Sequence, residues 1–215
     1  MSLSTPDMQE ALAWAAGEWG VALAPETGEA LDLLLDEVLR WNARLRLVGH
    51  RDRAKALVDL ILDALALVPL VRGDTLLDIG SGAGFPGLVL ALALPKVAVT
   101  LLEGRAKKVS FQKQAVRLLD LGRRVNPLVG RAGEGAYQRG EFGTVTLRAV
   151  SGLGASLGLG RPQAIPGGRV LLPRGREDLA AATDLGLATR LYRLPPPFGE
   201  RLLVWEDQPA CRAWA

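Results

Sequence analysis

Apolar positions along this chain change their spacing at about residue 73. Before it, they recur every three or four residues, and after it short apolar runs alternate with segments of helical periodicity. The first pattern predicts helices, and the second predicts a mainly parallel sheet whose strands are joined by helices. We therefore expect an N-terminal helical extension over 1–72 and an α/β domain over 73–215.

The N-terminal segment predicts successive helices. Ser4 or Thr5 can cap the first helix, with Pro6 at its first position. The next helix has the clearest pattern, over about 28–46, where apolar residues recur on one face and acidic residues occupy the other. A further helix over about 53–71 is apolar enough to pack on a sheet. No catalytic motif is visible in these helices.

The second region predicts seven strands, most of them separated by helices. The strands span 75–79, 97–102, 124–128, 144–147, 169–172, 187–194 and 202–205. The helices span 86–94, 105–121, 151–161 and 177–185, with a short turn near 132–138. No helix separates the last two strands, so they should form an antiparallel pair. This organisation resembles that of class I S-adenosylmethionine-dependent methyltransferases, which have a Rossmann-like α/β fold.

The first strand-to-helix turn is the most informative stretch. It reads Leu-Leu-Asp-Ile-Gly-Ser-Gly-Ala-Gly-Phe-Pro-Gly over 76–87. Glycines let the main chain approach a bound molecule closely, and the helix that follows offers unpaired N–H groups and the positive end of its dipole. The order of strand, glycine turn and helix favours a nucleotide-like cofactor over a purely structural turn, although a glycine-rich composition alone can produce such strings.

A second acid discriminates between cofactors. Glu103 follows the second strand, where its carboxylate can accept hydrogen bonds from both hydroxyls of a ribose. Nicotinamide-dependent dehydrogenases also place an acid there, and 82–87 contains their G-x-G-x-x-G string. However, the turn is compact and closed by Pro86, which suits a pyrophosphate poorly, whereas Asp78 and backbone carbonyls could favour the cationic groups of a sulfonium cofactor. We therefore expect S-adenosyl-L-methionine.

Composition excludes several other chemistries. The chain has one cysteine, Cys211, and one histidine, His50, so it offers neither an internal disulfide nor a His/Cys metal site nor a Cys–His catalytic pair. We expect His50 to be an exposed loop residue and the protein to bind no metal. The chain has no apolar run of membrane-spanning length and no signal-peptide pattern, which predicts a cytoplasmic protein that does not enter membranes. We further expect a monomer.

Charge is distributed unevenly along the chain. The formal net charge is +3, yet residues 1–42 are strongly acidic and residues 43–55 are basic. The basic segment is either a solvated face or a surface for a polyanion such as RNA. Its arginines are Arg44, Arg46, Arg51 and Arg53.

Four motifs carry a more specific resemblance. They are the turn at 76–87, Leu-Leu-Glu-Gly-Arg-Ala-Lys-Lys-Val-Ser-Phe at 101–111, Gly-Arg-Ala at 130–132 and Leu-Arg-Ala-Val at 147–150. In this order they resemble the RsmG family, also called GidB. The Phe-Pro-Gly ending of the turn and the Glu-x-x-x-Lys-Lys-x-x-Phe spacing separate it from other methyltransferases, and Trp41-Asn42 and Asp63 also fit. The likeness spans about residues 40–205.

This resemblance implies an enzyme that methylates N7 of a guanine in 16S rRNA of the 30S ribosomal subunit, near the decoding site. It implies cofactor contacts from Gly80, Ser81, Gly82, Phe85, Glu103, Gly104, Arg105, Ala132, Gly133, Glu134 and Arg148. Arg148 would also be the catalytic residue. RNA would be bound by the arginines at 44, 46, 51 and 53 together with Lys107, Lys108 and Arg174, although such lysines are often only a solvated helix face.

The expected chemistry needs no catalytic base, because guanine N7 already has an available lone pair. The enzyme should therefore lower the reaction barrier mainly by placing the two reactants in line. Arg148 could hold guanine O6 or a phosphate, or it could form only an ion pair at a strand end. Two other classes stay open: a methyltransferase for a small molecule, and a cofactor-binding ribosome assembly factor without required turnover. The chain departs from the family mainly at positions expected to affect RNA docking. Leu60 stands where the family usually has a histidine, and residues 209–215 lack the family's basic Tyr-Pro-Arg motif.

Overall fold

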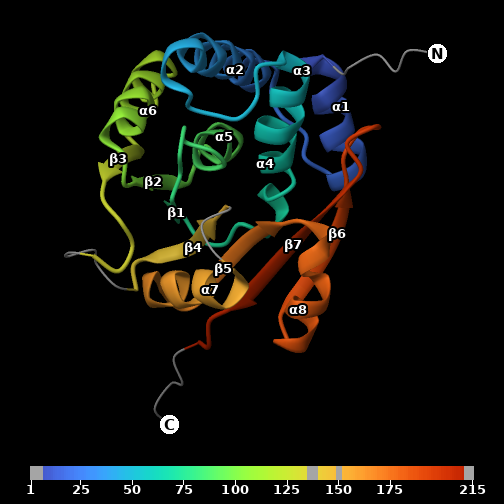
Figure 1. Ribbon diagram of the computed structural model, residues 1–215, viewed down its shortest axis with the longest axis vertical. Coiled ribbons are helices and arrows are strands. Elements are labelled where there is room, and N and C mark those ends of the chain that lie inside the picture. Colours follow the sequence, from blue (N-terminus) through green and yellow to red (C-terminus); the bar gives the residue numbers. More distant parts are fainter. Residues whose placement is uncertain (1–6, 135–139, 149–151, 211–215) are drawn as a thin grey trace.

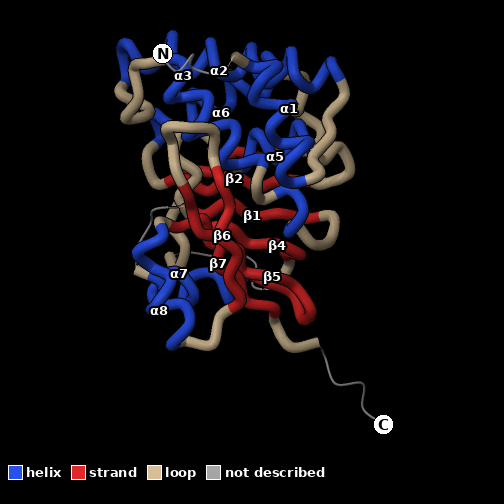
Figure 2. Tube along the Cα trace, turned by 90° about the vertical axis from the view of Figure 1, so that its right-hand side faces the viewer, coloured by secondary structure: helices blue, strands red, loops and turns tan. Residues whose placement is uncertain are grey.

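The computed structural model describes residues 7–134, 140–148 and 152–210. These residues form a seven-stranded sheet with helices on both faces (Figures 1 and 2). The strands are β1 (Thr75–Ile79), β2 (Ala98–Glu103), β3 (Val125–Val129), β4 (Phe142–Leu147), β5 (Ala164–Arg174), β6 (Ala188–Arg193) and β7 (Glu200–Asp207). They lie in the order β3-β2-β1-β4-β5-β7-β6.

The direction of the strands defines the fold class. β7 is antiparallel to both β5 and β6, and the remaining neighbours are parallel. The prediction of a mainly parallel sheet with an antiparallel C-terminal strand is therefore confirmed. The carboxyl ends of β1, β2, β4 and β5 meet at one edge, which is where ligands bind in sheets of this kind.

Eight α-helices surround the sheet within the described ranges. They are α1 (Met8–Trp19), α2 (Pro25–Leu45), α3 (Arg53–Ala56), α4 (Asp63–Leu65), α5 (Gly87–Ala93), α6 (Ala106–Leu118), α7 (Leu153–Gly160) and α8 (Leu179–Asp184). A π-helical segment, η1 (Leu57–Leu62), joins α3 to α4, and short 3-10 turns span η2 (Val68–Leu70), η3 (Arg161–Gln163) and η4 (Arg176–Asp178).

The sheet separates two buried cores. Alternate residues point to opposite faces, so Leu76 and Leu101 join the core beneath α1, α2, η1, α4, α5 and α6, whereas Leu77 and Leu102 join the core beneath α7 and α8. Figure 1 shows the first set of helices above the sheet and the second below it. The helices of the N-terminal segment thus share one core with a face of the sheet, and the domain division at residue 72 stays a prediction.

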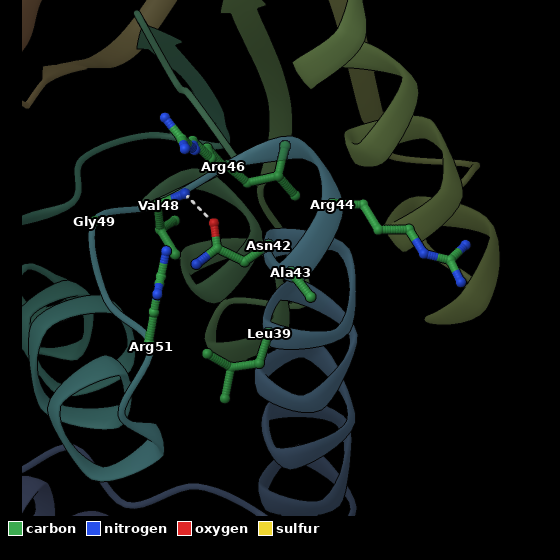
Figure 3. Close-up of a pocket in the computed structure, with 9 residues that line it drawn as sticks. Leu39, Asn42, Ala43, Arg44, Arg46, Val48, Gly49 and Arg51 are labelled. Carbon is green, nitrogen blue, oxygen red and sulfur yellow. Dashed lines mark hydrogen bonds between the residues drawn. The ribbon is translucent and has the colours of Figure 1, made fainter.

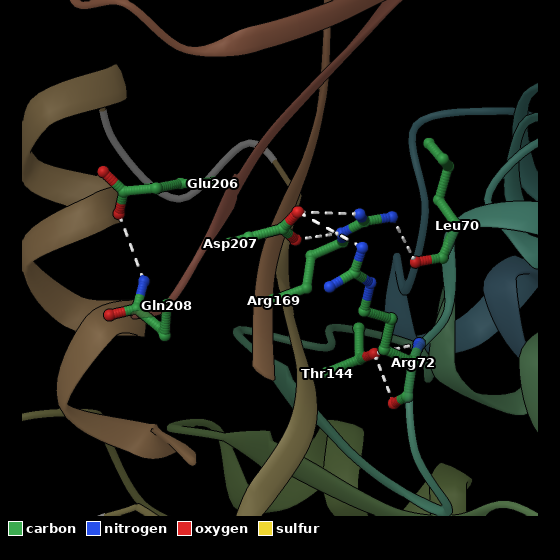
Figure 4. Close-up of polar contacts among 7 residues, drawn as sticks. All are labelled: Leu70, Arg72, Thr144, Arg169, Glu206, Asp207 and Gln208. Carbon is green, nitrogen blue, oxygen red and sulfur yellow. Dashed lines mark hydrogen bonds and ion pairs between the residues drawn. The ribbon is translucent and has the colours of Figure 1, made fainter. Parts of the chain in front are cut away.

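Polar contacts close the junction between the N-terminal segment and the sheet (Figure 4). Arg169 on β5 donates from Nε to Asp207 Oδ1 at 2.7 Å and from Nη1 to the Leu70 carbonyl at 3.0 Å. The Thr144 hydroxyl accepts from the Arg72 N–H at 2.7 Å and donates to the Arg72 carbonyl at 2.9 Å. The segment that leads into β1 is therefore tied to β4, β5 and β7.

Several predicted boundaries need correction. The N-cap of α1 is Asp7, in a reciprocal capping box with Glu10, so the predicted cap at Ser4 or Thr5 is wrong; residues 1–6 lie outside the described part of the chain. β5 begins at Ala164 because Ala164 pairs with Phe142, and the strand register then shifts before Arg169 pairs with Thr144. The intervening Pro and Gly residues concealed this strand in the sequence.

Other predicted features fall partly on residues that the structure does not describe. They include part of the turn near 132–138, the start of the helix predicted over 151–161, Ala149 and Val150 of the fourth motif, and Cys211. The helix predicted over 53–71 is helical along most of its length, but it is built from α3, η1, α4 and η2.

Candidate cofactor and acceptor site

The glycine turn connects β1 to α5 and is packed so closely that side chains are excluded. Gly84 has a φ of +89°, and a Cβ there would lie 2.5 Å from Leu88 Cδ1. A Cβ on Gly87 would lie 2.3 Å from Leu101 Cδ2 and 2.9 Å from Asp78 Oδ2. The glycines therefore allow the first turn of α5 to pack directly on β1 and β2.

Two buried side chains support this turn from below. Asp78 Oδ2 accepts a hydrogen bond from the Gly87 N–H at 2.9 Å. Gln112 on α6 donates from Nε2 to Ser81 Oγ and to the Gly82 carbonyl, both at 2.8 Å. Gln112 was missed in the sequence, where the available signal was a polar residue next to Phe111 on the apolar side of a helix. The loop conformation is thus held before any ligand binds.

The position of Asp78 changes its expected role. Its carboxylate is fully buried and lies outside the described lining of the cavity beside the turn. Burial raises the pKa of Asp78 to about 7, against the opposing effects of the Gly87 N–H and the positive charge of Arg148. Asp78 therefore supports the turn from inside the protein, and its interaction with cationic groups of a cofactor stays a prediction.

Glu103 lies at the carboxyl end of β2 and faces the same turn. Its Oε2 accepts from the Gly82 N–H and its Oε1 accepts from the Arg105 N–H, each at 2.9 Å. A carboxylate has about four acceptor positions, so both oxygens keep capacity for further donors. Its side chain is held rigidly at the edge of a cavity of about 490 Å³. This arrangement fits a nucleoside whose ribose presents two hydroxyl donors.

Six of the predicted cofactor residues line this cavity: Gly80, Glu103, Gly104, Arg105, Ala132 and Glu134. Five further residues line the cavity without having been predicted as cofactor contacts: Ile79, Leu102, Gly130 and Arg131, which belong to the quoted motifs, and Leu159. The cavity therefore lies between the glycine turn, the end of β2 and the loop after β3, as expected for a ligand that spans these strands.

The other predicted cofactor residues lie outside the described lining. Ser81 is buried beneath the turn, and the Phe85 side chain belongs to the hydrophobic core. Gly82 contributes its N–H to Glu103, while Gly133 is exposed in the turn after β3. Arg148 lines a separate cavity. Direct contacts from these five residues stay a prediction.

Arg148 follows the last residue of β4 and is held by the N-terminal segment. Its Nη2 donates to the Asp59 carbonyl at 2.6 Å and lies 3.2 Å from Asp63 Oδ2. The ion pair considered as an alternative therefore exists. The Arg148 side chain nevertheless keeps 27% of its surface exposed and lines a cavity of about 450 Å³ between the ends of β4 and β5. We call this cavity the acceptor basin.

Arg174 ends β5 on another side of the acceptor basin. Its Nη2 donates to Ser156 Oγ on α7 at 2.5 Å, and only 8% of its side-chain surface is exposed. Burial lowers the pKa of its guanidinium, and Asp178 opposes this shift. Arg174 therefore contributes charge beside the basin and exposes little of itself to a large partner such as RNA.

The arginines at 44, 46 and 51 surround a loop that returns to the end of α2 (Figure 3). Asn42 fixes this loop by donating to the His50 carbonyl at 2.7 Å and accepting from the Val48 N–H at 2.9 Å. The three arginines are exposed around an open cavity of about 1150 Å³. In Figure 3, Arg44 extends away from Arg46 and Arg51, which lie on the Val48 side. We call these three residues the arginine loop.

The remaining basic residues differ in their ion pairing and in their exposure to solvent. Arg53 donates to Asp32 at 2.8 Å and to Asp36 at 3.0 Å on α2, so its charge is already paired. Lys107 is exposed and Lys108 is half-buried beside Gly82. RNA contacts from these residues stay a prediction.

His50 is not the exposed residue that the sequence predicted. Its side chain is 23% exposed, and its Nε2 lies 3.4 Å from Asp59 Oδ2. The described ranges contain no cluster of three or more side chains suited to bind a metal ion. They also contain no helix long and apolar enough to span a membrane.

Comparison with known proteins adds to this geometry. The family described as rRNA small subunit methyltransferase G matches residues 27–186. The ribosomal RNA small subunit methyltransferase G of Myxococcus xanthus is 40% identical over 85% of this chain and 88% of its own length. The Alkalilimnicola ehrlichii protein of the same name is 38% identical over 90% of each chain. A SAM-dependent methyltransferase from Aquifex aeolicus shares the fold, with a TM-score of 0.54 at 18% identity over 71% of this chain and 92% of that one.

Proposed function

Because the chain belongs to the rRNA small subunit methyltransferase G family, we propose that it transfers a methyl group from S-adenosyl-L-methionine to N7 of a guanine in 16S rRNA. We place this guanine near the decoding site of the 30S subunit. The observation that carries the proposal is the cavity at the glycine turn, where Glu103 presents a fixed carboxylate to a nucleoside ligand.

The residues of this cavity suit the cofactor. Glu103 would accept from the ribose hydroxyls, while the loop containing Ala132 and Glu134 would lie along the base. When bound, S-adenosyl-L-methionine supplies an electrophilic methyl group, which the N7 lone pair takes while the electrons of the carbon–sulfur bond stay with sulfur. The protein is not required to remove a proton from N7, so its contribution is to align the reactants and exclude water.

The acceptor basin is the proposed place for the guanine. It opens beside the ends of β4 and β5, and its described lining carries four arginines and four carboxylates: Arg148, Arg174, Arg176, Arg201, Asp63, Glu177, Asp178 and Glu200. Guanidinium groups suit O6 and phosphate oxygens, whereas carboxylates suit the N–H donors on the opposite edge of guanine. Arg148 would hold O6 and thereby orient N7.

The arginine loop is the proposed docking surface for rRNA. Its three exposed arginines form no ion pair among the described residues, so their charges are available to phosphates. The large exposed apolar side chains of the described residues are scattered over α2, α6, β3, β6 and the segment after α8, which supports action as a monomer. We propose that this monomer acts on 30S subunits in the cytoplasm without a metal.

The decisive experiment uses 30S subunits from cells that lack the gene, incubated with the purified protein and S-adenosyl-L-methionine. We expect one new N7-methylguanosine in 16S rRNA, located by mass spectrometry of RNA fragments. Unmodified guanine despite 30S binding would instead indicate an assembly factor. Methyl transfer to a small molecule without RNA would indicate the other alternative.

Variants of Arg148 test the acceptor basin in the same assay. Arg148→Ala should lower methyl transfer about a hundredfold, because the guanine loses its orienting fork. Arg148→Lys keeps a positive charge beside Asp63 but removes the fork, so it should also be strongly impaired. Circular dichroism and S-adenosyl-L-methionine affinity serve as controls. Activity near that of the wild type in both folded variants would remove Arg148 from the active centre.

A further inference from the structure

The Arg148 side chain, which we place in the acceptor basin, is held by residues that are distant from it in the sequence. Arg148 receives its two described contacts from Asp59 and Asp63, which belong to η1 and α4 of the N-terminal segment. A third residue, Tyr192 on β6, donates its hydroxyl to Asp63 Oδ1. We call Asp63, Tyr192 and the Asp59 carbonyl the Arg148 clamp.

One of these contacts is made by the π-helical segment. In an α-helix the Asp59 carbonyl would accept from the Asp63 N–H, four residues later. Here the Asp63 N–H donates to the Val58 carbonyl instead, as expected in a π-helix. The Asp59 carbonyl, one residue further on, accepts from Arg148 Nη2 at 2.6 Å. Short π segments of this kind recur at functional sites.

Asp63 is held so that its two oxygens serve different partners. Its side chain is 7% exposed, Oδ1 accepts from Tyr192, and Oδ2 lies 3.2 Å from Arg148 Nη2. Burial and the negative charge of Asp63 raise the pKa of Tyr192, so the phenol remains a donor. The ring of Tyr192 packs edge-on against Trp19 of α1, with the ring centroids 5.8 Å apart. The Asp63 carboxylate is thus held by Tyr192 at one oxygen and by Arg148 at the other.

The charge of the clamp also matters for methyl transfer. N7 methylation places a positive charge on the guanine ring, and an unpaired guanidinium beside that ring would oppose this change. Asp63 makes the Arg148 pair neutral while leaving part of the guanidinium exposed to the basin. The Asp63 carboxylate would therefore act on the reaction through Arg148.

From this geometry we infer that Asp63 is a positioning residue of the methyltransferase: through the clamp it aims the Arg148 guanidinium into the acceptor basin and neutralises its charge. This inference rests on the proposed function. It also makes part of the N-terminal helical segment a component of the active centre.

The test compares Asp63→Asn with Asp207→Asn. Both changes remove one carboxylate charge that faces an arginine with a largely buried side chain, but Asp207 pairs with Arg169 and Arg72 at the junction between the N-terminal segment and the sheet. With 30S subunits as substrate, Asp63→Asn should lower kcat at least about tenfold, while KM and the Kd for S-adenosyl-L-methionine stay within about twofold. Asp207→Asn should keep the kcat of the wild type even if its melting temperature falls.

A second readout does not depend on activity. In ¹⁵N NMR spectra, the Arg148 guanidinium N–H signals, assigned with Arg148→Lys, should show slow exchange in the wild type and averaging in Asp63→Asn. If Asp63→Asn does not fold, Tyr192→Phe removes only the hydroxyl and should lower kcat about threefold with the same NMR change. Unchanged Arg148 signals and kcat in a folded clamp variant would overturn the inference. If the wild type did not methylate guanine, but Asp63→Asn still changed the exchange of the Arg148 N–H signals, only the proposed function would be overturned.

Discussion

The glycine turn and the Arg148 clamp lie at the carboxyl ends of neighbouring strands, β1 and β4, yet they are assembled in opposite ways. The turn is contained in one continuous stretch, supported by nearby strands and α6. The clamp joins residues separated by 89 and 129 positions in the chain. The proposed cofactor site is therefore a local motif, whereas the orientation of the arginine proposed to hold the acceptor depends on how the whole chain folds.

The largest effect should come from crowding the turn. In Gly87→Ala the new methyl group would overlap Leu101 and the Asp78 carboxylate, so α5 must move away from the sheet. We expect S-adenosyl-L-methionine affinity to fall at least about a hundredfold and the free energy of unfolding to fall by about 1–3 kcal/mol. Isothermal titration calorimetry and urea unfolding measure the two effects.

Gly122→Ala is the matched control for that substitution. Nothing lies within 4 Å of the position where a Cβ would stand on Gly122, and its φ is not in the left-handed region. This variant should bind the cofactor with the affinity of the wild type. If Gly87→Ala behaved in the same way, close packing of the turn would not be required for binding.

The pH dependence of stability should sharpen the same comparison, because the hydrogen bond that Asp78 accepts comes from the turn. Its pKa is about 7 in the folded protein, compared with 3.8 for an ordinary aspartate. The folded state therefore holds this proton more tightly, and the stability that it contributes is complete below about pH 4 and is lost as pH rises through 7. Its contribution should fall by about 4 kcal/mol, at about 1.4 kcal/mol per pKa unit.

Asp78→Asn tests this contribution, because an asparagine oxygen can still accept from the Gly87 N–H. The difference in unfolding free energy between the variant and the wild type should become more favourable to the variant as pH rises from 4 to 8. Denaturant unfolding across that range measures it. A difference that does not change with pH would contradict a protonated, buried Asp78.

The smallest effect concerns the arginine loop. Like the glycine turn, it comes from one continuous stretch of sequence, but it faces solvent. Arg51 forms no ion pair with any of the described residues, whereas Arg53 already pairs with Asp32 and Asp36. Arg51→Ala should lower 30S affinity a few-fold and reduce the slope of log affinity against log salt by about 1. Arg53→Ala should change the slope less. Equal slopes for the two variants, measured by filter binding at several salt concentrations, would remove the loop from the RNA surface.

The sequence predicted the parts of this protein whose determinants are contiguous. The strand, glycine turn and helix of 76–87 and the acid Glu103 after the next strand were predicted correctly to lie around one cavity, because strand alternation and backbone geometry are local properties. The same reasoning located the antiparallel final pair, since the absence of a helix between two strands is visible in the sequence.

Contacts between distant segments could not be predicted from the sequence in the same way. No local pattern shows that Asp63 would meet Arg148, or that Gln112 would support Ser81 from α6. The half-buried position of His50 also depends on Asp59, which reaches it only through the packing of η1. These features depend on tertiary packing, in which a π-helical segment and an arginine at a strand end become neighbours.

The π-helical segment has a consequence for inherited variation. A π-helical turn corresponds to one residue inserted into an α-helix. An in-frame deletion of one codon within 57–62 would leave every recognisable motif intact and allow a regular α-helix. Because the π-helical turn is what accommodates the extra residue, the parts of the helix before and after it would keep nearly the same relative orientation. Such a deletion would therefore test whether the π-helical geometry itself, apart from any sequence motif, is needed to hold Asp59 and Asp63 against Arg148.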